Sequence, residues 1–175
     1  MLIRHTRACA SVFVLACCAA LLAGCGKPAV IEPPRPVNVV IEVRASPAAN
    51  PDAGGRPSPT AVRIYQLADG AAFAEADLTS LWSAETALLA ATLVARQEFL
   101  VAPGATERAA LTLDPATRLI GVAAAFRDFR SATWRTVKPV PTGDTAPTDL
   151  ALNVSLEARS LSADLKPIVP AEVEK

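Results

Sequence analysis

An alternation of apolar and polar residues with a period of two restricts the fold of this chain more than any other feature. It is clearest at residues 37–44, where Val37, Val39, Ile41 and Val43 alternate with Asn38, Val40, Glu42 and Arg44. Successive side chains of a β-strand point to opposite faces, so this pattern predicts a strand with one face against a core. Similar alternation occurs at residues 61–67, 108–113 and 150–157, and more weakly at 94–101, 134–140 and 161–165.

Residues 119–126 are apolar throughout, which predicts a central strand covered on both faces. One side of this strand would carry the large side chains of Ile120, Val122 and Phe126. The other side would carry the small residues Gly121, Ala123 and Ala125. Turn signals at Pro103-Gly104, Asp114-Pro115 and Thr142-Gly143-Asp144 separate the segments. The chain is therefore predicted to be mainly β, a two-sheet β-sandwich of about eight strands.

One segment, residues 72–91, departs from the period of two. Apolar side chains fall at i, i+4, i+7 and i+8 in Ala74, Leu78, Leu81 and Trp82, which predicts an amphipathic helix. Ser83 is then expected to cap a second short helix through Leu88 and Leu89. This helical insertion is predicted to pack on one edge or face of the sandwich.

The N-terminus has the layout of a secretory signal peptide. Arg4 and Arg7 precede an apolar stretch, residues 8–23, that is too short for a comfortable membrane-spanning helix. The stretch ends in Leu-Ala-Gly-Cys at residues 22–25, which resembles the lipobox of bacterial lipoproteins. That resemblance implies cleavage before Cys25 and a lipid on its thiol, whereas the alternative is a plain signal peptide with an incidental cysteine.

Cleavage before Cys25 would change the chemistry available to the chain. It would remove the only histidine, His5, and the other three cysteines, and would leave 15 basic and 17 acidic residues. Without histidine or a free thiol, Ser-His, Cys-His and imidazole–metal sites are excluded, so we expect no enzyme, no metal and no cofactor other than the lipid. A nearly neutral surface also does not indicate nucleic acid as a partner.

The predicted organisation is a signal peptide at 1–24, a lipidated tether at 25–36, a sandwich at 37–166 and a flexible tail at 167–175. Four prolines in the tether favour an extended chain. Lipid alone would attach the protein, since two or three acyl chains hold a protein to a bilayer where one does not. Gly26 follows the lipid cysteine, and lipoproteins with no aspartate there are generally sorted to the outer membrane, on its periplasmic face.

The longest irregular stretch within the predicted sandwich is residues 45–60, which are rich in proline and glycine. Long loops in compact domains are uncommon and often functional, although a solvated connection explains the composition equally well. The run from Asn50 to Gly55 is similar to the start of a calcium loop. However, the twelfth position is Ala61, where a bidentate glutamate is required.

Several segments in this order resemble the outer-membrane lipoproteins of the type VI secretion system, the TssJ family. They are the lipobox and proline tether, residues 37–46, Asn50-Pro51-Asp52, residues 56–59 leading into 62–67, Phe73 with 76–78, residues 100–104, and residues 121–128 followed by Trp134-Arg135. The resemblance runs from Cys25 to about Lys166. It implies a transthyretin-like sandwich with a small helical element.

The resemblance also implies a role as a docking module. In the family, the lipoprotein binds the periplasmic domain of the inner-membrane protein TssM, and the loop between the first two strands makes much of the contact. That loop corresponds here to residues 45–60, within which Asn50, Asp52 and Arg56 would supply polar contacts and Pro57 would fix the shape. Two alternatives remain: a transthyretin-like small-ligand binder or hydrolase, and a lipoprotein of another envelope machine.

Replacing the predicted lipid site gives the first prediction. Cys25→Ser removes the thiol that accepts the lipid, so the variant should lack the acyl chains and leave the membrane fraction. Mass spectrometry of the N-terminal peptide and detergent phase partitioning measure the two effects. An unmodified thiol on the exported unchanged protein, or a mature start at any other residue, would contradict the prediction.

Overall fold

A computed structural model describes residues 35–143 and 145–169. They form eight strands, as the sequence predicts: β1 (Val37–Ala45), β2 (Thr60–Leu67), β3 (Leu93–Val101), β4 (Thr106–Leu113), β5 (Leu119–Ala124), β6 (Arg135–Pro139), β7 (Asp149–Leu156) and β8 (Leu161–Pro167). Between β2 and β3 lie the short helices α2 (Ala71–Glu75), α3 (Leu78–Ser83) and α4 (Glu85–Leu89), and the 3₁₀ turn η1 (Ala90–Thr92).

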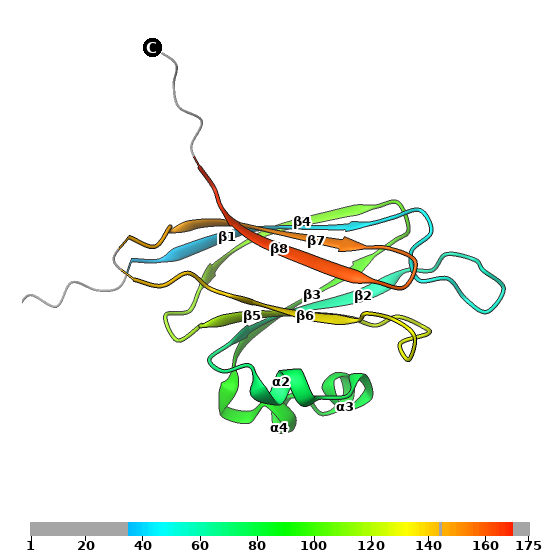
Figure 1. The fold of residues 1–175 in the computed structure, drawn as a ribbon, viewed down its shortest axis with the longest axis horizontal. Coiled ribbons are helices and arrows are strands. Elements are labelled where there is room, and N and C mark those ends of the chain that lie inside the picture. The colour runs from blue at the N-terminus through cyan, green and yellow to red at the C-terminus, as the bar shows by residue number, and fades with distance from the viewer. Residues whose placement is uncertain (1–34, 144, 170–175) are drawn as a thin grey trace, which may run out of the picture. The chain divides into compact units, whose positions relative to one another are not determined.

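The strands form two four-stranded sheets, which Figure 1 shows stacked one above the other. Their strand orders are β4-β1-β7-β8 and β3-β2-β5-β6. All pairs are antiparallel except β1 with β7, in which Val39 lies opposite Leu150 in parallel register. The second sheet carries the helices on its outer side, so the domain has three layers (Figure 1).

The core lies between the two sheets and is formed by the apolar residues that alternate with polar ones along the strands. Val39, Ile41 and Val43 of β1 are fully buried, whereas Val40, on the opposite face of the strand, is 48% exposed. They pack with inward residues from six other strands, including Val62, Ile64, Ile120, Val122, Leu150, Leu152 and Val154. The predicted sandwich is confirmed.

The helices cover the outer face of β2 and β5 and form a second cluster there. It comprises the buried side chains Tyr65, Leu67, Phe73, Ala76, Leu81, Leu89 and Ala123. Burial raises the pKa of Tyr65 to about 12, so its hydroxyl stays protonated at neutral pH. Strand β5 is therefore covered on both faces, as its unbroken apolar sequence predicts.

Small residues on β5 make room for this layer. A Cβ on Gly121 would come within 3.0 Å of Cζ of Phe73 and 3.0 Å of Cδ1 of Leu67. Those distances are shorter than ordinary van der Waals contact. The large and small sides of residues 119–126 thus correspond to the sandwich core and to the surface beneath α2.

The prediction for the helical insertion was wrong in detail. A single helix cannot include both Ala74 and Leu78, because the chain leaves the helical conformation at Ala76, with ψ 141°. Helix α3 then starts afresh from Asp77, whose carboxylate accepts a hydrogen bond from the N–H of Ser80. Ser83 does not cap α4; its hydroxyl donates to the carbonyl of Thr79, and Ala84 is the N-cap.

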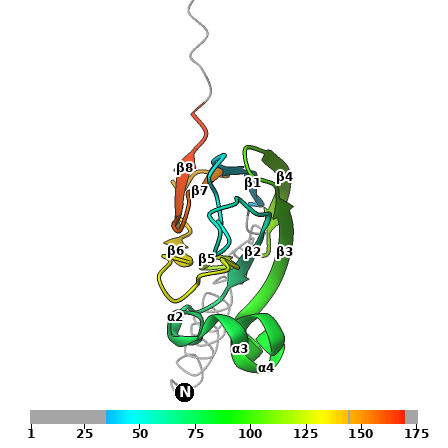
Figure 2. The ribbon, with the colours of Figure 1, turned by 90° about the vertical axis from the view of Figure 1, so that its right-hand side faces the viewer.

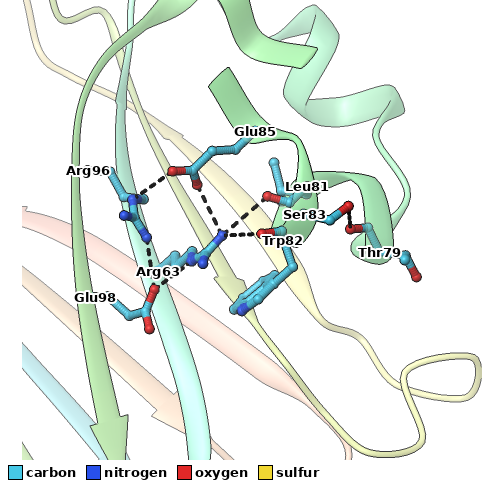
Figure 3. Close-up of polar contacts among 8 residues, drawn as sticks. All are labelled: Arg63, Thr79, Leu81, Trp82, Ser83, Glu85, Arg96 and Glu98. Atoms are coloured by element: carbon cyan, nitrogen blue, oxygen red, sulfur yellow. Dashed lines mark hydrogen bonds and ion pairs between the residues drawn. The ribbon is translucent and has the colours of Figure 1, made fainter. Parts of the chain in front are cut away.

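Arg63 of β2 connects the sheet to the helices (Figure 3). Its Nη1 donates to the carbonyls of Leu81 and Trp82 at the end of α3, each at 3.3 Å, and to Glu85 at 3.1 Å. Its Nε donates to Glu98 of β3 at 2.7 Å. Carbonyls in the last turn of a helix have no partner within the helix, so Arg63 satisfies groups that the fold would otherwise leave unpaired.

Arg135 of β6 donates in the same way to carbonyls at the end of α2. Its Nη1 donates to the carbonyl of Phe73 at 3.1 Å and also to that of Ala76. Both arginines stack on tryptophan rings, Arg63 at 4.5 Å from Trp82 and Arg135 at 4.7 Å from Trp134. Two sheet arginines therefore hold the ends of helices that are too short to be stable alone.

Several predictions lie outside the described residues: the signal peptide, Cys25 and the tether as far as residue 34. Within residues 35–143 and 145–169, no helix is long and apolar enough to cross a membrane. The predicted tail begins one residue too early, since Pro167 belongs to β8 and the N–H of Ile168 donates to the carbonyl of Asp149.

Arg63→Met tests the attachment of the helical layer. Only 12% of the Arg63 side chain is exposed, and its loss leaves two helix carbonyls without this donor and Glu85 with Arg96 as its remaining ion-pair partner. We expect the free energy of unfolding to fall by about 2–4 kcal/mol. Chemical denaturation monitored by circular dichroism measures this change.

Arg108→Met is the matched control. It also removes an arginine paired with a glutamate, Glu42, but on an exposed sheet face where 66% of the arginine side chain is accessible. We expect a loss of about 0–1 kcal/mol. Equal losses in the two variants would contradict the special role of Arg63.

Candidate partner-binding loop

The loop between β1 and β2, residues 46–59, lies at one end of the sandwich. Three other connections lie at the same end: residues 102–105, 125–134 and 157–160. Figure 2 looks onto this end, with the β1–β2 loop at its centre. Arg35, where the described chain begins, precedes β1 and lies at the opposite end.

The base of the loop is fixed by backbone hydrogen bonds to β7, to the β3–β4 connection and within the loop itself. The N–H of Ser46 donates to the carbonyl of Leu156 at 2.8 Å, and the N–H of Ser58 donates to that of Ala49 at 3.1 Å. Gly104, with φ 76°, donates to the carbonyl of Ala45 at 3.1 Å. The two arms of the loop therefore lie close together and leave the sandwich at a fixed point.

Asn50 is buried within this base, with 2% of its surface exposed. Its Nδ2 donates to the carbonyl of Pro59 at 3.0 Å, and its Oδ1 accepts from the N–H of Arg127 at 2.7 Å. Its φ of 53° lies in the left-handed region, which asparagine tolerates better than most residues. In this chain both ends of the amide are therefore occupied by backbone groups.

Asp52 organises the outer part of the loop. Its Oδ1 accepts from the backbone N–H of Gly54 at 2.9 Å and of Arg56 at 3.0 Å, and its Oδ2 pairs with the Arg56 guanidinium at 2.8 Å. The backbone N–H of Arg56, supported by its guanidinium, holds the pKa of Asp52 below its usual value. The ionised carboxylate thus closes a tight turn, with Gly55 at φ 79°.

The tip of the loop faces solvent. Residues 53–57 are all exposed, and 85% of the Arg56 side chain is accessible although it pairs with Asp52. Pro57 is exposed and precedes the buried Ser58. The result is a projecting, internally hydrogen-bonded segment with a small apolar and cationic tip.

The structure thus separates the four residues that were predicted as partner contacts. Arg56 and Pro57 lie at the exposed tip, and Asp52 is half-buried beneath it. Asn50 is not available as a surface contact in this structure, because it is buried and both of its amide groups are paired. Its place is at the base of the loop.

Sequence reasoning did not identify the neighbouring loop, residues 125–134, as part of this surface. It places Arg127 close enough to Asp52 to contribute to lowering its pKa. Asp128 accepts from the hydroxyl of Ser131 and lies 3.5 Å from Arg159 of the β7–β8 turn. No local pattern predicts these contacts, since the three loops are far apart in sequence.

Metal ligands do not gather at this end or elsewhere in the part of the chain that the structure describes, where no group of three His, Cys, Asp or Glu residues could hold an ion. The Asp52 carboxylate, the third position of the calcium-like run, is bonded to the loop itself.

Comparison with known proteins identifies relatives. Residues 37–159 match the T6SS-SciN family, described as type VI secretion lipoprotein, VasD, EvfM and TssJ. The crystal structure of the lipoprotein TssJ1 from Pseudomonas aeruginosa is 36% identical, with a TM-score of 0.70, and the match covers 77% of this chain and 99% of that one. No curated protein matches significantly.

Two further structures are similar at 29% identity. One is described as the type VI membrane complex, with a TM-score of 0.64 over 77% of this chain and 98% of that one. The other is described as the TssM C-terminal domain from EAEC, with a TM-score of 0.56 over 75% and 98%. Since the family match spans well over half of the 175 residues, this chain belongs to the TssJ family of type VI secretion lipoproteins.

Proposed function

We propose that this protein is a lipid-anchored docking module of the outer membrane that binds the periplasmic domain of a TssM-like inner-membrane protein. Membership of the TssJ family is the observation that carries the proposal. The similar chains from structures described as the type VI membrane complex and the TssM C-terminal domain support this partner. The family match also favours this machine over another envelope apparatus.

The two ends of the domain support a division of labour. The described chain begins at Arg35, before β1, and the loop of residues 46–59 leaves from the far end of that strand. Nine residues of strand span about 30 Å. With a lipid on Cys25, the domain would hold its loop at the end away from the anchor, toward a partner that reaches across the periplasm.

The loop has the properties of a preformed binding segment. Its outer turn is closed by Asp52, and its arms are joined by the hydrogen bond between Ser58 and Ala49. A segment that is ordered before binding loses less conformational entropy when it docks. The exposed Arg56 offers a guanidinium suited to carboxylates and carbonyls of a partner.

The same family membership supports a role without catalysis. A transthyretin-like hydrolase would rely on histidines, and the only histidine of this chain is His5, within the predicted signal peptide. The lipid on Cys25 is then the only covalent group that the proposed function requires.

Replacing the loop tests the docking role. Because Ala49 and Ser58 are hydrogen-bonded, a Gly-Ser-Gly bridge can substitute for residues 51–57 without displacing β1 or β2. We expect this variant to fold and to lose capture of the partner's periplasmic domain in a pull-down, and Arg56→Ala to weaken binding by about 1 kcal/mol or more.

Arg118→Ala is the control for that experiment. Arg118 is also exposed, but it lies in the β4–β5 connection at the other end of the sandwich. The Arg118→Ala variant should bind the partner's periplasmic domain as tightly as the unchanged protein does. Undiminished capture by the loop-replaced variant would rule out the loop as the docking surface.

A further inference from the structure

Three loops that are distant in sequence meet at one buried residue, Asn50. The backbone N–H of Asn50 donates to the carbonyl of Ala158 at 3.0 Å in the β7–β8 turn. Its Oδ1 accepts from the N–H of Arg127 in the β5–β6 loop, and its Nδ2 donates to Pro59 within its own loop. In Figure 2 these loops surround the same end of the sandwich.

The position requires the particular chemistry of asparagine. A φ of 53° favours glycine or asparagine, but glycine would leave the N–H of Arg127 and the carbonyl of Pro59 without their partner. Aspartate would accept from Arg127 but could not donate to Pro59 when ionised. Only an amide supplies both the donor and the acceptor at this reach.

We infer that Asn50 is a positioning residue that joins residues 46–59, 125–134 and 157–160 into a single docking surface. This inference rests on the proposed function and extends it beyond the β1–β2 loop. Asn50 does not touch the partner; it fixes the direction in which the loop leaves the sandwich. It also sets Arg127 and the Asp128–Arg159 pair beside the loop.

Asn50→Gly provides the test, since glycine keeps the left-handed backbone and deletes only the amide. Gln66→Ala is the matched control. Gln66 is also a buried amide, 8% exposed, and its Oε1 accepts from the N–H of Asp114 and the hydroxyl of Thr117, each at 2.9 Å, at the opposite end of the sandwich. Both variants lose a side-chain amide that satisfies loop groups, so general destabilisation affects both.

Two measurements on the full protein, purified in detergent, decide the outcome after circular dichroism has shown that each variant folds. Hydrogen exchange should show loss of protection at the amides of Arg127 and Ser58 in Asn50→Gly, and unchanged protection there in Gln66→Ala. Calorimetric titration with the partner's periplasmic domain should show a dissociation constant raised about tenfold in Asn50→Gly and by less than twofold in Gln66→Ala.

Other results would overturn the inference. Retained protection at Arg127, a dissociation constant within twofold of the unchanged protein, or equal weakening by Gln66→Ala would each do so. If Asn50→Gly does not fold, Asn50→Asp decides by the dissociation constant alone, because it keeps the acceptor for Arg127 and loses only the donor to Pro59. A dissociation constant within twofold of the unchanged protein would then overturn the inference. Failure of the proposed function is recognised separately, since the loop-replaced variant would then bind like the unchanged protein.

Discussion

The contact between the apolar inner faces of the two sheets determines where everything else in this domain can lie. Val39, Ile41 and Val43 of β1 are buried against residues of β2 and β5, and this packing fixes both sheets relative to each other. Once the strands are stacked, their connections must emerge at the two ends. Four connections meet at one end, and the described chain begins at the other, at Arg35 before β1. The separation of the β1–β2 loop from the start of β1 is thus a consequence of strand packing.

Around this core, a few polar side chains satisfy backbone groups that regular structure leaves unpaired. Arg63 and Arg135 donate to unpaired carbonyls at the ends of short helices. Asn50 and Gln66 bond to backbone groups of loops at opposite ends of the sandwich. Buried backbone groups without a partner are costly, so each such side chain determines the path of a segment that has little core of its own. The helical layer and the candidate docking loop are held by the same physical means.

This arrangement connects the family's role to the construction of the domain. A docking protein needs a surface whose shape does not change with the fluctuations of its tether. Here Asp52 closes the tip of the loop and Asn50 fixes its base, so the tip bearing Arg56 projects from an internally bonded segment.

The sequence by itself determined the strands, because alternation with a period of two is a local property and each strand of the sandwich has one apolar face. It also determined that β5 is a central strand covered on both faces. It did not determine where the helices break. Asp77 starts a new helix inside a helical spacing of apolar residues that looks continuous in the sequence. The role of Asn50 was decided only by the tertiary structure. Its partners Arg127 and Ala158 lie 77 and 108 positions away along the chain, and no local pattern specifies which backbone groups will need an amide once the loops converge.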